Sequence, residues 1–178
     1  MSDAAETIVE SIVYKGALFE IVERPEAIFC GKIAYAQNLT DEPDIEKLLA
    51  DYQKLVSIQK EERIAPEWDA AISIDYWLGG AAPRGMMFAQ EVATEKQSEV
   101  YGIYKMPESL FMRVFHDAKA AGALGKEKCE IWELFALMTD TIMPQYGYKH
   151  NENGAQDFEY YNWSKYGSGF AYVPIIKA

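Results

Sequence analysis

The chain has 178 residues, of which 49% are apolar and 13% aromatic, which is sufficient for one folded domain with a sizeable core or for two small fused units. Its net charge of −11 argues against nucleic-acid binding by the chain itself, because a DNA-binding surface must carry the positive charge that replaces counterions. The sequence has no run of 18 apolar residues and residues 2–6 do not resemble a signal peptide, so we expect a cytoplasmic protein without membrane contacts.

The first part of the chain predicts an N-terminal extension, then a strand and a helix. Residues 1–15 are expected to form a tail or an added strand ahead of a domain at 16–178, whose first strand starts near Phe19. The acidic, capped segment 40–43 predicts the start of an amphipathic helix of about 16 residues. Its apolar residues recur at helical spacing: Ile45, Leu48, Leu49, Tyr52, Leu55 and Val56.

Part of this pattern returns 82 residues later. Four positions match at that offset: Ile21 with Ile103, Pro25 with Pro107, Glu26 with Glu108, and Phe29 with Phe111. A second amphipathic helix is predicted at the same offset, from about Lys126 to Met143, with Trp132 beside its apolar stripe. The stripe consists of Ile131, Leu134, Phe135, Met138 and Ile142. Internal similarity of this kind predicts a repeated supersecondary unit.

Each half is expected to end in a strand hairpin, with a glycine-containing loop between the strands. The predicted strands are 71–78 and 86–94 in the first half, and 157–163 and 169–176 in the second. At an offset of 84 residues, Asp75 matches Glu159 and Phe88 matches Tyr172. The difference of two residues between the offsets lies in the loops, where a change in length has a small entropic cost.

These patterns predict an α+β fold built from two strand–helix–strand–strand repeats, at about residues 16–95 and 98–178. The repeats are expected to be related by a pseudo-twofold axis and to form one antiparallel sheet with the two main helices on one face. A seam between repeats is a natural place for a ligand cleft, and Asp75 and Glu159 would flank it.

The strand at 157–163 carries the strongest functional signal. Alternate side chains share a face of a strand, so Glu159, Tyr161 and Trp163 are expected to point the same way. A carboxylate between two rings is costly to bury without a partner. It either lies at a rim, where it reaches water or an arginine, or forms the negatively charged floor of an aromatic pocket that suits a flat or lipophilic cation.

Other chemistries have little support in the sequence. His116 and His150 lack a recognisable serine or cysteine partner, and no cluster has metal-ligand spacing or the form of a phosphate-binding loop, so we expect neither a metal nor a cofactor. Cys30 and Cys129 both lie in apolar segments, which favours a reduced protein with the cysteines far apart, one on a strand and one on a helix.

A group of acidic and aromatic residues remains as the predicted ligand site: Glu159, Tyr161, Trp163, Tyr172, Trp77 and Asp75. Together with the doubled pattern, the segments 19–25, 158–161 and 170–176 resemble the GyrI-like small-molecule-binding domain, the effector-binding module of multidrug-sensing bacterial transcription activators. The resemblance covers about residues 16–177. It implies that Glu159 is the acid that contacts the ligand and that Tyr172 lines the pocket.

The resemblance also implies a role in the pocket for Trp132, from its place on the second helix. No DNA-binding helix-turn-helix is expected before the domain, so direct transcription-factor activity is not expected either. The predicted function is that of a stand-alone protein that binds amphipathic or cationic aromatic molecules, sequestering them or signalling to a partner such as a regulator. One alternative is a hydrolase of reactive, cyclopropane-bearing compounds with Glu159 as acid or base. Another is an interaction protein that inhibits gyrase.

Overall fold

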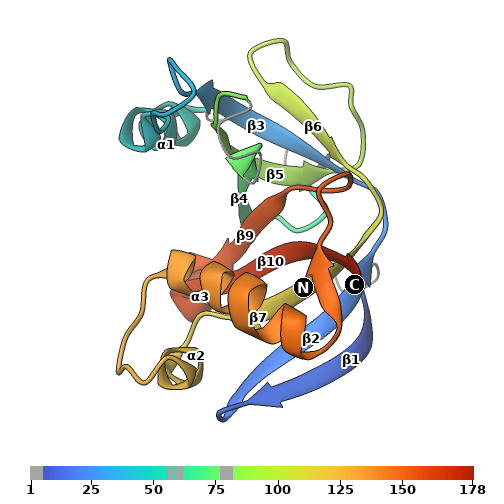
Figure 1. Cartoon of the computed structure of the whole chain (residues 1–178). Coiled ribbons are helices and arrows are strands. Elements are labelled where there is room, and N and C mark those ends of the chain that lie inside the picture. The colour runs from blue at the N-terminus through green and yellow to red at the C-terminus, as the bar shows by residue number, and fades with distance from the viewer. Residues whose placement is uncertain (1–5, 56–57, 59–61, 77–81) are drawn as a thin grey trace.

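The computed structural model describes residues 6–55, 58, 62–76 and 82–178, which form a single antiparallel sheet of ten strands (Figure 1). The strand order is β1-β2-β7-β10-β9-β4-β5-β3-β6, and β8 pairs with the end of β10. The strands are β1 (Thr7–Tyr14), β2 (Ala17–Arg24), β3 (Ala27–Tyr35), β4 (Asp69–Ile74), β5 (Gly85–Val92), β6 (Gly102–Met106), β7 (Ser109–Phe115), β8 (Tyr148–His150), β9 (Asp157–Asn162) and β10 (Ser168–Lys177). The expected α+β class and single antiparallel sheet are confirmed.

The described helices are short: α1 (Ile45–Lys54), α2 (Ala118–Ala123), α3 (Ile131–Leu137), a π-helical turn (Met138–Ile142), α4 (Met143–Gln145) and α5 (Trp163–Tyr166). The helix α1 packs on β3 and β5, whereas α3 packs on β10 (Figure 1). Both helices lie on the same face of the sheet, which we call the helical face. Phe88 packs with α1, and Val114 packs with α3. The strand register places both side chains in one row across the sheet: Phe88, Ala71, Glu159, Ala171 and Val114. None of the described helices is long and apolar enough to span a membrane.

Both predicted main helices start later than expected. The N-cap of α1 is Asp44, whose carboxylate accepts a hydrogen bond from the Lys47 backbone amide at 3.0 Å. The helix therefore starts at Ile45, and it has 10 residues. The second helix begins after Glu130, where Glu130 and Glu133 form a reciprocal capping box. The preceding residues form α2 and a turn at Gly125, whose φ of +73° suits a glycine.

The predicted first strand of each half is in fact two strands. Pro25 separates β2 from β3, and Pro107 separates β6 from β7, because proline has no N–H to donate to a ladder. The strand–helix–strand–strand pattern therefore missed one strand in the first half; in the second half it missed both this division and the short strand β8. Within the predicted extension 1–15, β1 pairs antiparallel with β2 and forms one edge of the sheet.

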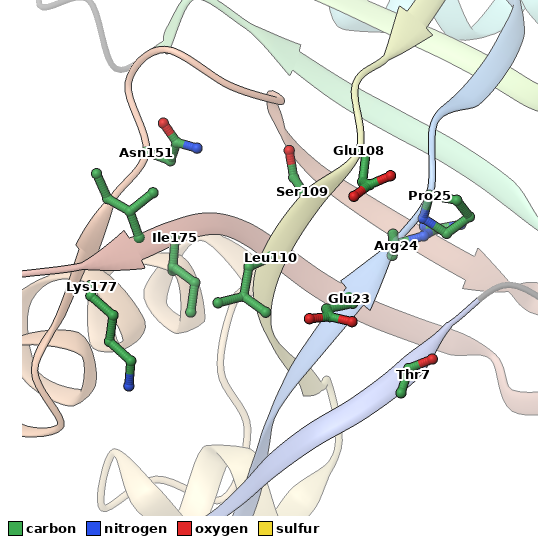
Figure 2. A pocket seen from close by; sticks show the side chains of 11 residues that line it. Thr7, Glu23, Arg24, Pro25, Glu108, Ser109, Leu110, Asn151, Ile175 and Lys177 are labelled. Carbon is green, nitrogen blue, oxygen red and sulfur yellow. The ribbon is translucent and has the colours of Figure 1, made fainter.

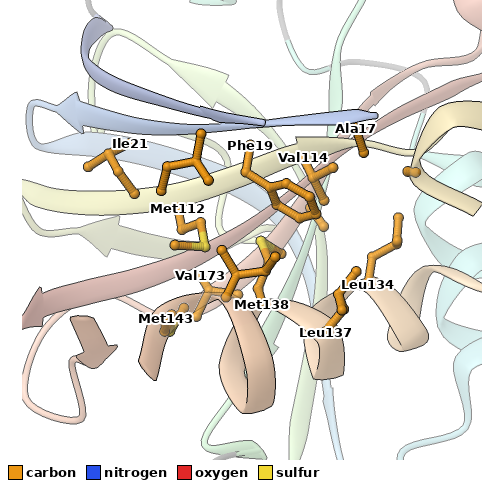
Figure 3. Packing of buried hydrophobic residues seen from close by; sticks show 14 of the residues in the cluster. Ala17, Phe19, Ile21, Met112, Val114, Leu134, Leu137, Met138, Met143 and Val173 are labelled. Carbon is orange, nitrogen blue, oxygen red and sulfur yellow. The ribbon is translucent and has the colours of Figure 1, made fainter. Parts of the chain in front are cut away.

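A core made mostly of aliphatic and sulfur-containing side chains fills the space between α3 and the sheet (Figure 3). Its sheet side includes Phe19, Ile21, Met112, Val114 and Val173, and its helix side includes Leu134, Leu137, Met138 and Met143. From the predicted helix stripe, Leu134, Met138 and Ile142 are fully buried, whereas Ile131 and Phe135 are half-buried. The apolar stripe of this amphipathic helix thus faces the core.

The opposite face of the sheet has an aromatic core. Phe158 and Tyr172 stack with their centroids 4.4 Å apart, and Phe111 meets both rings edge-on. The two cysteines are free: Cys30 is buried on β3, and Cys129 is half-buried in the segment before α3 rather than on the helix.

Candidate ligand-binding site

Glu159 lies at the middle of the sheet, between two alanines. It is on β9, in register with Ala171 of β10 on one side and with Ala71 of β4 on the other. Both alanines are buried, at 0% and 3% exposure, and side chains this short leave room beside the longer glutamate. The small neighbours therefore favour access to the carboxylate from the helical face.

The helices cover the two sides of this row and not its centre. Leu48 of α1 packs with Ala71 and Phe88. Leu134 of α3 belongs to the core that contains Ala171. Figure 1 shows α1 and α3 well separated on this face of the sheet, with β9 and β4 running between them. Glu159 thus lies between the two helix-covered regions.

The Glu159 carboxyl is unusually easy to protonate. Burial raises its pKa from 4.5 to about 7, because a charge in a partly buried site loses hydration. Within the described part of the chain, no hydrogen bond or ion pair reaches its oxygens. Burial is also the main cause of the raised pKa values of Tyr161 and Tyr76, and the charge of Glu159 adds to both. At neutral pH the site therefore holds a carboxyl near its titration midpoint, with two phenols close by.

Tyr161 stands beside Glu159 on the same face of β9. Its neighbour on β10 is Gly169, where a Cβ would lie 2.3 Å from the Tyr160 carbonyl oxygen and 2.4 Å from Tyr161 Cα, so the close approach of the two strands requires a glycine here. On the other side it pairs with Asp69, whose Oδ1 accepts a hydrogen bond from the Tyr52 hydroxyl at 2.6 Å. The Gln90 amide donates to the same oxygen at 2.5 Å, which fixes the Asp69 carboxylate as one wall of the site.

The three tryptophans expected at the site have different positions. Trp163 is the first residue of α5 and is 63% exposed, and its ring lies 5.3 Å from that of Tyr161, so it forms a rim. Trp132 on α3 is 66% exposed. Trp77 lies outside the described residues.

Tyr172 does not belong to the site, and the expectation that it lines the pocket is wrong. It pairs in register with Phe158, so it points to the face opposite Glu159. There it is fully buried, and its hydroxyl donates to Glu6 Oε1 at 2.8 Å and accepts from Arg113 Nη1 at 3.1 Å. Tyr172 is therefore part of the core.

Asp75 is also separate from Glu159. It follows the end of β4, four residues beyond Ala71, which corresponds to about 13 Å along a strand. Its φ of +60° turns the backbone, its N–H donates to Gln156 Oε1 at 3.1 Å, and Gln156 Nε2 donates to its carboxylate at 3.2 Å. The prediction that Asp75 flanks the cleft with Glu159 is therefore wrong.

A buried ionic network on the opposite face was not foreseen from the sequence. Arg24 is 3% exposed, with Nε at 3.1 Å from Glu6 Oε1 and Nη2 at 3.4 Å from Glu91 Oε2. Three rings surround its guanidinium at 5.2–5.4 Å: Phe158, Tyr160 and Tyr172. Arg24 is therefore an internal cation that is held both by carboxylates and by aromatic rings.

A separate pocket of about 720 Å³ lies near the ends of β1, β2, β7 and β10 (Figure 2). Glu23, Glu108 and Lys177 line it together with Asn151 and Ile175. Three of its four charged side chains, Glu23, Glu108 and Lys177, are exposed, so water competes with any ligand for them. The fourth, Arg24, is buried and already paired with Glu6 and Glu91. We regard this pocket as a weaker candidate than the partly buried Glu159 site.

Each histidine lies close to an oxygen atom that can act as a hydrogen-bond acceptor. His116 Nε2 lies 2.7 Å from the Cys129 carbonyl oxygen, and His150 Nε2 lies 2.8 Å from Asp157 Oδ1. Over the described ranges, no group of three or more histidine, cysteine or acidic side chains is placed to hold a metal ion.

Comparison with known proteins identifies the fold. No protein-family model matches the sequence, and no curated protein matches it. Among solved structures, the chain is similar to the integron cassette protein VCH_CASS2 from the mobile metagenome of Vibrio cholerae. The TM-score is 0.51 at 10% sequence identity, and the match covers 89% of this chain and 95% of that chain. At this identity, the similarity establishes a shared fold.

Proposed function

We propose that the protein binds small amphipathic or cationic aromatic molecules at Glu159, on the helical face of the sheet. One observation carries this proposal: a partly buried carboxylate between Ala71 and Ala171, with no hydrogen bond or ion pair to the described residues. Natural proteins seldom keep a buried charge without compensation. A cationic ligand would supply the missing partner.

The surrounding groups suit such a ligand. A cation over the ring of Tyr161 or Trp163 gains about 0.5–2 kcal/mol, depending on how far it is desolvated. An ionised Glu159 adds a charge-assisted contact of about 1.5–3 kcal/mol. Because the cation favours the ionised form, binding should lower the pKa of Glu159 and release a proton below pH 7. Affinities near 1 μM, or about −8 kcal/mol, are expected for a modest ligand.

We further propose that the chain is a GyrI-like domain made of two repeats with a pseudo-twofold axis. The strand order supports this, because the first half contributes β3-β5-β4 and the second β7-β10-β9, with β4 and β9 adjacent at the seam. On this proposal the protein sequesters its ligand or signals to a protein partner such as a regulator or gyrase. A pull-down with purified gyrase tests the latter role.

The test of the binding proposal is calorimetric titration with tetraphenylphosphonium and with its uncharged analogue triphenylphosphine oxide. In Glu159→Gln, the affinity for the cation should fall roughly 10- to 150-fold, while that for the oxide should stay unchanged. Glu127→Gln is the matched control, because it removes the same charge from an exposed residue. A Glu159→Gln protein that binds the cation as tightly as the parent would show that the acid is structural.

A hydrolase is the second candidate, and the pKa of Glu159 favours it. A carboxyl that titrates at about 7 can give or accept a proton near neutral pH, as general acid–base catalysis requires. The two functions differ in turnover. An enzyme would consume an activated cyclopropane electrophile catalytically and lose this activity in Glu159→Gln, whereas a binding protein would leave the compound intact.

A further inference from the structure

Four aromatic rings form a closed circuit on the face of the sheet opposite Glu159. The centroids of Trp68 and Phe170 are 6.2 Å apart, and those of Phe170 and Phe115 are 5.0 Å apart. The circuit continues from Phe115 to Tyr166 at 5.7 Å and closes from Tyr166 to Trp68 at 6.0 Å. These same four side chains line a pocket of about 230 Å³.

The pocket depends on four separate segments of the chain. Phe115 ends β7, Phe170 lies on β10 and Trp68 immediately precedes β4. Tyr166 ends α5, and Gly167 turns the chain into β10 through a left-handed φ of +61°. Trp68 is 5% exposed, whereas Tyr166 is 47% exposed, so Trp68 forms the floor and Tyr166 the open side.

The composition of the walls selects an uncharged ligand. No charged side chain is among the described residues that line the pocket, so an ion would lose hydration there without gaining a partner. Two of the rings already meet cations of the protein itself. The Arg113 guanidinium lies 4.5 Å from the centroid of Phe170, and Lys165 Nζ lies 5.0 Å from that of Tyr166. The cation–π interactions of these two rings are therefore already made by the protein's own cations.

The volume of the four-ring pocket and the polar side chains of an adjoining pocket indicate the size and polarity of the ligand. Apolar cavities of about 150 Å³ are large enough to take benzene, so 230 Å³ accommodates one six-membered ring. A second pocket of about 300 Å³ shares Phe115 and Phe170 with the first and is also lined by Glu20, Asp117 and Lys119. We propose that the four-ring pocket is a binding site for an uncharged single-ring aromatic group that carries a short polar substituent. The site is distinct from Glu159.

The experiment uses 4-fluorobenzyl alcohol as the probe, followed by fluorine NMR line broadening. We expect a Kd of about 1 mM for the parent, as is typical of so small a ligand. Tyr166→Ala removes one exposed wall and should weaken binding at least tenfold. Tyr146→Ala is the matched control, because that tyrosine is 37% exposed and does not line the pocket; it should bind like the parent.

Two further measurements decide the assignment. Nuclear Overhauser effects should connect the probe to the Trp68 indole, and the probe should bind Glu159→Gln as it binds the parent. The charged analogue 4-fluorobenzyltrimethylammonium should bind this pocket more weakly than the alcohol. Binding that survives in Tyr166→Ala, is lost in Glu159→Gln or is absent at 10 mM probe would overturn the proposal, as would an Overhauser contact elsewhere. Tighter binding of the ammonium compound in the pocket would overturn the ligand class.

Discussion

Replacing Glu159 by glutamine should make the protein more stable, and the gain should depend on pH in a defined way. Burial raises the pKa of this carboxyl from 4.5 to about 7 in the folded state. Below pH 4.5 the carboxyl is protonated in both the folded and the unfolded chain, so it has no ionisation cost. Between pH 4.5 and 7 the unfolded chain releases the proton while the folded chain retains it. The parent should therefore lose stability as the pH rises through this window.

The magnitude follows from the two pKa values. A rise from 4.5 to about 7 corresponds to roughly 3 kcal/mol of unfolding free energy lost once the carboxyl is ionised in both states. Because the side chain is only partly buried, this figure is an upper limit. Glutamine keeps the shape of the protonated acid and has no charge to desolvate. Glu159→Gln should thus match the parent near pH 4 and exceed it by roughly 1–3 kcal/mol at pH 8.5.

Urea denaturation of both proteins between pH 4 and pH 8.5 measures this difference directly. Burial also raises the pKa of Glu91, but that group is present in both proteins and largely cancels in the comparison. Glu127→Gln serves as the control and should give a nearly constant difference from the parent. If the free-energy difference for Glu159→Gln does not grow between pH 4.5 and 7, the carboxyl is not desolvated and the reasoning about the site fails.

Three other substitutions or treatments test particular contacts. Tyr172→Phe removes two buried hydrogen bonds and should lower the unfolding free energy by about 1–3 kcal/mol in urea titrations. The affinity for tetraphenylphosphonium should not change, and a loss of affinity would show that Tyr172 contributes to the ligand site. Ala71→Leu places bulk beside Glu159 and should weaken tetraphenylphosphonium binding at least tenfold by calorimetry; unchanged binding would place the ligand elsewhere. Burial raises the pKa of Cys30 to about 11, so iodoacetamide at pH 8 should modify this thiol only after the protein unfolds. Mass spectrometry measures the modification, and rapid labelling of the folded protein would contradict the burial of Cys30.

The sequence carried the information for the faces of β9 but not for those of its partner strand. Alternation alone placed Glu159 and Tyr161 together, because the period of a strand is exactly two residues. The pocket role of Tyr172 came from the family resemblance, and the offset of 84 residues had matched Tyr172 with Phe88. In the sheet, Phe88 is opposite Ala71 and Ala171 is opposite Glu159, so the residue of β10 on this row is one position earlier. An error of one residue reverses the face of a side chain.

The tertiary contacts had no signal in local sequence patterns. Arg24 and Arg113 each look like ordinary charged strand residues, and only the pairing of β2 with β7 brings them together around Glu6. The division of the first predicted strand into two strands, β2 and β3 or β6 and β7, was also missed, although Pro25 and Pro107 mark the breaks. Helix stripes were easier to predict, because burial of Leu134 and Met138 follows from a period of 3.6 residues.

The most direct test of a cation site at Glu159 is the pKa of its carboxyl, measured by carbon-13 NMR with and without tetraphenylphosphonium. In the free protein the resonance should titrate with a pKa of about 7. With saturating tetraphenylphosphonium, the pKa should fall by at least one unit, because the bound cation stabilises the carboxylate. Triphenylphosphine oxide should not lower it. A free-state pKa near 4.5, or a pKa that does not change when the cation binds, would contradict the proposed site.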